Sequence, residues 1–123
     1  MDDSEGAKIN VLVVEDEWWI AEMIAGILNN AGYGVIGPAD TIEASLTLIE
    51  DQRVDAALLD VNLGTTMSYP VADALIARST PTLLMTGYHY TDLPHLYHQL
   101  PLLSKPTTPQ SILAALAQLL SSI

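Results

Sequence analysis

The stretch Val54-Asp55-Ala56-Ala57-Leu58-Leu59-Asp60-Val61-Asn62 decides the fold, because four apolar residues in it run directly into a carboxylate. A run this short, bounded by polar residues and Gly64, predicts a strand buried on both faces, as in a parallel sheet covered by helices. Ligands of such sheets bind at the carboxyl ends of the strands, so Asp60 stands where chemistry is expected. Taken alone, Asp60 also has an ordinary reading as a turn residue.

Size and composition favour one domain of residues 8–123 behind a disordered acidic tail of residues 1–7. The chain has no cysteine, which excludes a disulfide framework and suits a reducing compartment. The start lacks the basic region of a signal peptide, and no apolar run approaches the roughly 18 residues of a membrane span. We therefore expect a cytoplasmic protein.

Charge limits the partners of the chain. The formal net charge is −11, and the basic residues are four: Lys8, Arg53, Arg78 and Lys105. Nucleic acids and anionic membranes are bound by clusters of Lys and Arg, so neither is expected as a partner. A cation, or a protein with a basic or apolar face, suits this charge better.

Apolar patterns predict strands that alternate with helices along the whole chain. The expected strands cover 9–14, 35–36, 56–59, 82–86 and 100–103. Helices are expected from Trp18 to Ala31, around 42–49, from Pro70 onward, and from Pro109 to about Ser121. This alternation predicts an α/β fold, with one open five-stranded sheet and helices on both faces.

Smaller features carry expectations of their own. Asp40, with Glu43 three residues on, resembles a capping box for the second helix. Pro38 and Pro101 place the second and last strands at the edges of the sheet. Of Trp18 and Trp19, one is expected to pack and one to be exposed. The apolar residues of the last helix exceed one stripe, so they suit a core or a partner face equally. Residues 88–99 show little periodicity, with a short helix expected after Asp92.

Charged and hydroxyl side chains gather at the carboxyl ends of four predicted strands. The first strand ends in Glu15 and Asp16, the third in Asp60, the fourth in Thr86 and the fifth near Lys105. Three carboxylates this close need protonation or a cation, because a like-charged pair at about 4 Å costs about 4 kcal/mol. Oxygen ligands without Cys or His favour Mg²⁺ over softer metals. A carboxylate beside Mg²⁺, an amine and a hydroxyl is equipped to accept a phosphoryl group.

Four ordered motifs carry a family resemblance over about residues 8–121. They are Val11-Leu12-Val13-Val14-Glu15-Asp16, Leu58-Leu59-Asp60-Val61-Asn62, Met85-Thr86-Gly87 and Ser104-Lys105-Pro106. Together they resemble the receiver domains of two-component response regulators, a family with a flavodoxin-like fold and strand order 2-1-3-4-5. The resemblance implies that Asp60 is the phosphoacceptor, with Thr86 and Lys105 on the phosphoryl oxygens.

The resemblance also implies a metal site, a partner and an output. Asp16 and Asp60 would ligate Mg²⁺ directly, Glu15 through water, and Asn62 through its backbone carbonyl. The Lys105–Pro106 peptide would be cis. The expected phosphodonor is a sensor histidine kinase, and downstream proteins would dock on the face of helix 4, strand 5 and helix 5. The chain would act as a single-domain response regulator, or as a phosphate sink or relay. It would catalyse only its own phosphorylation and dephosphorylation, and is not expected to be an enzyme.

Two departures from the family pattern concern the switch. Leu102 stands where receivers usually carry a Tyr or Phe, three residues before the Lys. Leu84-Met85-Thr86-Gly87-Tyr88 resembles an alphaproteobacterial subgroup that has Phe-Ala-Thr-Gly-Tyr there and lacks the switch aromatic. We therefore hypothesise a short or disordered helix 4, with residues 88–99 mobile before phosphorylation and Tyr88 or Tyr90 replacing the missing ring.

Three alternatives remain from the residues. A haloacid-dehalogenase-like phosphatase needs a second Asp two residues after the nucleophile, where this chain has Asn62. A flavodoxin-like electron carrier needs a phosphate loop where Glu15 and Asp16 would repel FMN. A receiver-like docking module that never takes phosphate would not need Asp16, Asp60, Thr86 and Lys105 together.

Overall fold

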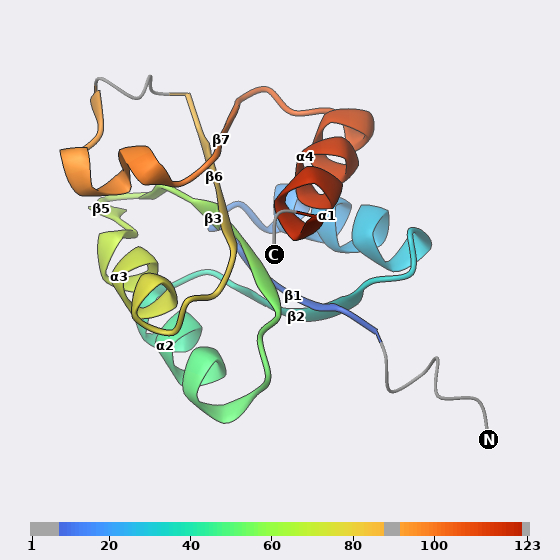
Figure 1. The fold of residues 1–123 in the computed structure, drawn as a ribbon, viewed down its shortest axis with the longest axis horizontal. Helices are drawn as coiled ribbons and strands as arrows, with labels where there is room; N and C mark the ends of the chain where they lie inside the picture. Colours follow the sequence, from blue (N-terminus) through green and yellow to red (C-terminus); the bar gives the residue numbers. More distant parts are fainter. Residues whose placement is uncertain (1–7, 88–91, 122–123) are drawn as a thin grey trace.

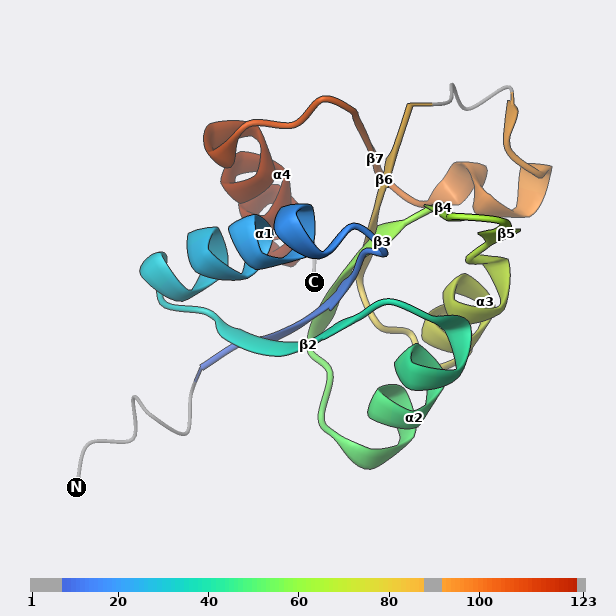
Figure 2. The ribbon, with the colours of Figure 1, turned by 180° about the vertical axis from the view of Figure 1, so that it is seen from behind.

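The computed structural model describes residues 8–87 and 92–121, which form one five-stranded parallel sheet with helices on both faces (Figures 1 and 2). The elements are β1 (Asn10–Val14), α1 (Trp18–Asn30), β2 (Gly34–Ala39), α2 (Ile42–Asp51), β3 (Ala56–Asp60), β4 (Asn62–Leu63), β5 (Thr66–Met67), α3 (Tyr69–Ala77), β6 (Thr82–Thr86), the 3-10 helix η2 (His95–Gln99), β7 (Leu102–Ser104) and α4 (Pro109–Ser121). The sheet order β2-β1-β3-β6-β7 confirms the expected 2-1-3-4-5 order of its strands.

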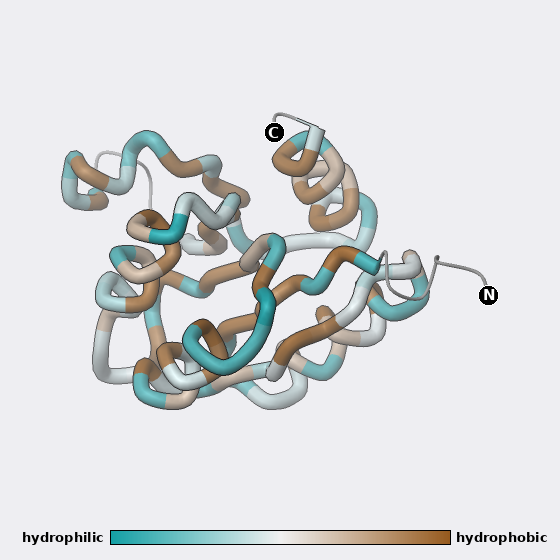
Figure 3. Tube along the Cα trace, turned by 60° about the horizontal axis from the view of Figure 1, so that its bottom comes forward, coloured by the Kyte–Doolittle hydropathy of each residue, from teal (hydrophilic) through white to brown (hydrophobic). Residues whose placement is uncertain are grey.

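The sheet separates two apolar cores. All its strand pairs are parallel, and every residue of β3 and β6 is buried, as the continuous apolar runs predict. On one face, Leu12, Leu59 and Leu75 belong to the core beneath α2 and α3; on the other, Leu58 and Ile24 belong to the core beneath α1 and α4. Figure 3 shows the strands as brown segments bounded by teal connections. The helices packed on both faces hold the strands in register, so the carboxyl ends of the strands have fixed positions at one edge of the sheet.

The second strand and the cap of the second helix differ from the prediction. β2 runs on to Ala39, because Gly37 adopts a φ of 86° and pairing with β1 resumes after this irregularity, at Val14 opposite Ala39. The prediction that Asp40 caps α2 was wrong. The cap is Thr41, whose Oγ1 accepts a hydrogen bond from the Ala44 N–H at 3.0 Å.

The elements after β3 also differ from the sequence prediction. The loop expected at 62–68 contains the short antiparallel pair β4–β5, which sequence reasoning missed. β7 begins at Leu102 instead of Leu100, since the Leu100 N–H donates to the carbonyl of Tyr97 and Pro101 has no N–H. Both β2 and β7 lie at edges, as expected.

The segment before β7 contains a short helix, as expected after Asp92: the 3-10 helix η2. Tyr97 is buried there; its hydroxyl donates to Asp73 on α3 at 2.7 Å, and its ring stacks on Tyr69 at 4.7 Å. Tyr88 and Tyr90 lie outside the described residues, so their replacement of the missing aromatic stays a prediction.

Both tryptophans at the start of α1 are exposed, at 76% for Trp18 and 55% for Trp19, so the expectation that one packs was wrong. The buried stripe of α1 passes through Ala21, Ile24 and Leu28, and neither tryptophan falls on it. In α4, by contrast, most of the apolar residues pack against the core on that face of the sheet, and Ile112 and Leu116 are fully buried. Within the described ranges, none of the helices has the length and apolar character to cross a bilayer.

Candidate functional site

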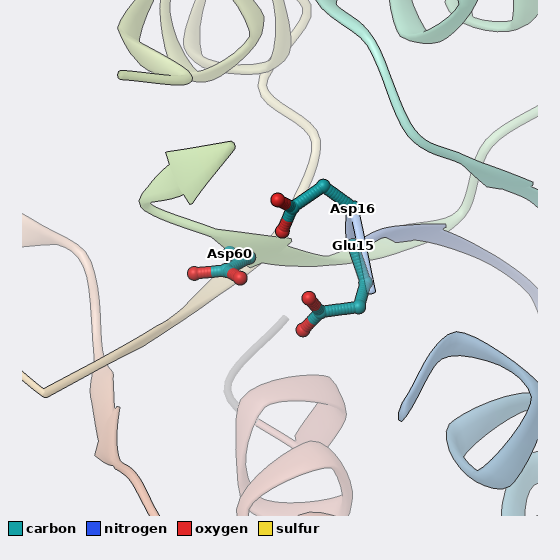
Figure 4. A group of neighbouring side chains, drawn as sticks. All are labelled: Glu15, Asp16 and Asp60. Carbon is teal, nitrogen blue, oxygen red and sulfur yellow. The ribbon is translucent and has the colours of Figure 1, made fainter. Parts of the chain in front are cut away.

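Three carboxylates converge at the carboxyl ends of β1 and β3. Asp60 is the last residue of β3, and Glu15 and Asp16 follow β1 directly. Figure 4 shows their side chains turned toward one another from these two strands, and one oxygen of each lies within 4.8 Å of the others. Parallel pairing of β1 with β3, with Val14 opposite Leu59, brings these ends together. Glu15 and Asp60 are buried, whereas Asp16 is half-buried.

Lys105 joins this group from the end of β7. Its Nζ lies 2.9 Å from Oδ2 of Asp60 and 3.4 Å from Oε1 of Glu15. The Lys105 backbone N–H donates to the carbonyl of Thr86 at 2.9 Å, which anchors the chain after β7 against β6. The Lys105–Pro106 peptide is cis, as the resemblance implied.

The charges of the group perturb one another. Burial, the largest influence, raises the pKa of Glu15 to about 7; the Glu17 N–H at 3.1 Å lowers it, and the negative charge of Asp60 raises it. For Lys105, burial lowers the pKa, but the hydrogen bond and charge of Asp60 outweigh burial and raise it above its usual value. The amine therefore stays charged beside the carboxylates at neutral pH.

The loop after β3 holds Asp60 in place. The Asn62 N–H donates to Oδ1 of Asp60 at 3.2 Å, while Lys105 occupies Oδ2. Ser68 is buried and its Oγ donates to the backbone carbonyls of Asp60 at 2.6 Å and Val61 at 3.1 Å. Sequence reasoning missed Ser68, although its place just before Pro70 and α3 is a usual position for a Ser.

A hollow of about 390 Å³ opens above these groups. The residues that line it include Asp16, Asp60, Asn62, Thr86 and Lys105, so five of the six site residues expected from sequence share it. Glu15, the sixth, is buried beside it and bonded to Lys105. Gly64 closes the β4–β5 side, where a Cβ would lie 3.3 Å from Oδ2 of Asp16.

The donor set suits a hard cation. Glu15, Asp16 and Asp60 supply carboxylate oxygens only, and oxygen ligands of this number fit Mg²⁺ with waters completing its shell. A divalent ion and the Lys105 ammonium together offset the three negative charges. The remaining hollow then has room for an anionic group next to Asp60.

Comparisons with known proteins agree with this geometry. The family model of the response regulator receiver domain matches residues 11–117. The solution structure of SdrG from Sphingomonas melonis Fr1 is similar at 40% identity, over 93% of this chain and 98% of that one, with a TM-score of 0.78. The BeF3-activated conformation of SdrG from Pseudomonas melonis Fr1 matches at 39% identity, over 93% and 98% of the two chains, with a TM-score of 0.77.

A more distant structure shares the fold: the receiver domain of the sensor histidine kinase PA1611 from Pseudomonas aeruginosa PAO1, which has a magnesium ion coordinated in its active site cleft. It is 22% identical over 93% of this chain and 98% of that one, with a TM-score of 0.79. A comparison with curated protein sequences gave no match.

The chain thus combines a flavodoxin-like parallel sheet with an acidic cluster at the carboxyl edge of that sheet. With the family model covering most of its length, the chain belongs to the response regulator receiver domain family. Phosphorylation by a histidine kinase is the role of that family, and its members are generally not true enzymes.

Proposed function

We propose that the chain accepts a phosphoryl group from a histidine kinase onto Asp60, in a reaction that requires Mg²⁺. The observation that carries the proposal is the contact of Lys105 Nζ with Oδ2 of Asp60 at 2.9 Å, beside a trio of carboxylates whose oxygens lie within 4.8 Å. An ammonium beside three carboxylates at one edge of the sheet has few structural explanations, whereas such a group can hold Mg²⁺ and stabilise charge on a transferring phosphoryl group.

Each residue then has a distinct task. Asp16 and Asp60 would ligate the ion directly, Glu15 would act through water, and Asn62 would contribute its backbone carbonyl. When bound, Mg²⁺ neutralises the carboxylates and offsets charge on the phosphoryl oxygens.

In the transfer itself, a carboxylate oxygen of Asp60 attacks phosphorus and forms the aspartyl phosphate, while the bond from phosphorus to the donor nitrogen breaks. Lys105 and the Thr86 hydroxyl hold the phosphoryl oxygens as charge moves onto them. Hydrolysis of the acyl phosphate by water later returns Asp60 to its free form.

Output is proposed to pass through protein contacts, or the domain serves as a phosphate sink or relay. The face of η2, β7 and α4 corresponds to the expected docking surface, and a hollow of about 480 Å³ lies there, between Leu100 and Leu102 on one side and Ala115 and Leu119 on the other. Leu102, which stands where receivers usually carry an aromatic residue, is half-buried and packs against the core beneath α2 and α3. A cytoplasmic location follows from the kinase as donor and stays part of the proposal.

Incubation with phosphoramidate and Mg²⁺, followed by intact mass measurement, tests the assignment. The mass of the wild-type chain should rise by one phosphoryl group, with no rise for Asp60→Asn or after chelation of Mg²⁺. Asp51→Asn, at an exposed carboxylate ending α2, is the matched control and should still be phosphorylated. Folded wild-type protein that gains no mass with phosphoramidate, and none with a phosphorylated kinase, would instead indicate a docking module that takes no phosphate.

A further inference from the structure

Three of the four basic residues of the chain line one hollow, far from the phosphorylation site. Lys8 precedes β1, Arg53 lies between α2 and β3, and Arg78 lies between α3 and β6. The strands are parallel, so these three positions share the amino-terminal edge of the sheet, whereas Asp60 is at the carboxyl edge. The fourth basic residue is Lys105. Every cation that the site does not use is therefore placed around one hollow, of about 460 Å³.

The cations of this hollow are only partly neutralised from within the chain. Asp55 is the one acidic residue among those lining it, and both of its oxygens are engaged: Oδ2 accepts from the Asn10 N–H at 2.8 Å, and Oδ1 accepts from Arg53 Nε at 3.1 Å. Lys8 and Arg78 are exposed and form no ion pair within the part of the chain that the structure describes. Among the described residues, two positive charges of this hollow thus have no acidic partner, in a protein whose net charge is −11.

Helix ends account for part of this arrangement. Arg78 is the C-cap of α3, and Arg53 follows the end of α2 by two residues, so both lie near the negative ends of helix dipoles. Lys8 adjoins no helix end, and helix dipoles do not require the three side chains to border the same hollow. A ligand that carries negative charge explains all three positions together.

We propose that this hollow binds a small phosphate ester. Guanidinium groups match phosphate oxygens with paired N–H donors, and the hydroxyls of Ser79 and Thr80 on the same rim add further donors. The remaining charge of +2, from three cations and Asp55, balances a phosphate dianion. Ile9, Val54, Pro81 and Leu120 line the hollow too and offer apolar contact to the organic part of the ligand. Its volume lies in the usual range for small-molecule sites, about 300–1,000 Å³.

Titration with AMP, adenosine and inorganic phosphate tests the proposal, monitored by amide chemical shifts and calorimetry. Chelator replaces Mg²⁺, so that the carboxylates repel phosphate from the Asp60 end. AMP should shift the amides of residues 53–55 and 78–80, and should bind more tightly than either adenosine or inorganic phosphate. Arg53→Gln and Arg78→Gln, both at exposed positions, should each weaken AMP binding by about tenfold while circular dichroism stays unchanged.

Gln110→Glu is the matched control, because it lowers the net charge by the same one unit at an exposed position in the first turn of α4, which follows the carboxyl end of β7 at the opposite edge of the sheet. It should leave AMP affinity within about twofold. The proposal would be overturned by absence of binding with millimolar AMP at 10-fold molar excess over the protein, by equal affinities for AMP and adenosine, or by equal weakening of AMP binding in all three variants. A loss of stability in Arg78→Gln without AMP binding to the wild type would assign the cations to the helix ends alone. All of these outcomes are independent of whether Asp60 takes a phosphoryl group.

Discussion

Replacing Glu15 by Gln should stabilise the metal-free protein, and the gain should grow with pH. Glu15 is buried, and its pKa rises from 4.5 to about 7 on folding, chiefly because burial disfavours the charged form. The folded state therefore holds a proton that the unfolded state has released between these two pH values. Stability from this group is fully present below pH 4.5 and is lost as the pH rises through 7.

The magnitude follows from the shift. Each pH unit between the two pKa values costs at most about 1.4 kcal/mol, so ionising Glu15 in the folded chain costs up to about 3 kcal/mol by pH 8. Gln has nearly the same shape and no charge to desolvate. Lys105 loses its contact with Glu15 at 3.4 Å but keeps the shorter one with Asp60 at 2.9 Å, which limits the loss.

The assay is urea unfolding in chelator at pH 5, 6, 7 and 8, for the wild type, Glu15→Gln and the control Glu50→Gln, at an exposed carboxylate on α2. We expect the free energies of unfolding of wild type and Glu15→Gln to be close at pH 5 and to diverge by about 2–3 kcal/mol at pH 8. Glu50→Gln should follow the wild type throughout. A constant difference between wild type and Glu15→Gln across this pH range would refute the burial argument.

Further predictions concern the metal, the helix cap and the cores. Mg²⁺ at about 100 times its dissociation constant should raise the unfolding free energy of the wild type by about 2.7 kcal/mol, and Asp16→Asn should lose most of this gain; an equal gain in both would remove Asp16 from the ligand set. Thr41→Ala should cost about 0.5–2 kcal/mol in urea unfolding while Asp40→Ala costs less, and the reverse order would restore Asp40 as the cap. Leu84→Ala should cost about 2–5 kcal/mol at a fully packed position of β6, and a cost below 1 kcal/mol would show that the core collapses around the gap. Tyr97→Phe should speed amide exchange in η2 (His95–Gln99) more than in β3, because it removes the hydrogen bond to Asp73 that ties η2 to α3; uniform exchange changes would contradict this.

The sheet and the site could be predicted from the sequence because both follow from position along the chain. Apolar runs such as 56–59 mark buried parallel strands, and the residues that directly follow them must meet at one edge. The convergence of Asp16, Asp60 and Lys105 required no side-chain detail beyond this. The oxygen ligands of these residues favour Mg²⁺ over softer metals, and a carboxylate beside an amine suggests phosphoryl transfer as the reaction.

Details that depend on local packing could not be predicted in this way. Asp40 and Thr41 are both good capping residues, and only the path of β2 to Ala39 makes Thr41 the cap. Both tryptophans are exposed because the side of α1 that faces the sheet does not include them. The apolar character of tryptophan alone does not predict which side of the helix that is. The role of Ser68 could not be predicted, because its hydrogen bond to the carbonyl of Asp60 depends on how the loop after β3 folds.

The contact between Lys105 and the carboxylates spans 45 residues to Asp60 and 90 to Glu15. A chain that ends before residue 105, whether truncated or still emerging from the ribosome, can present the acidic side chains but lacks the amine that balances them. Under the proposed function, the chain would therefore become able to accept a phosphoryl group only late in synthesis, once β7 has joined the sheet. On the same proposal, phosphorylation of Asp60 would show that the sheet is complete as far as β7.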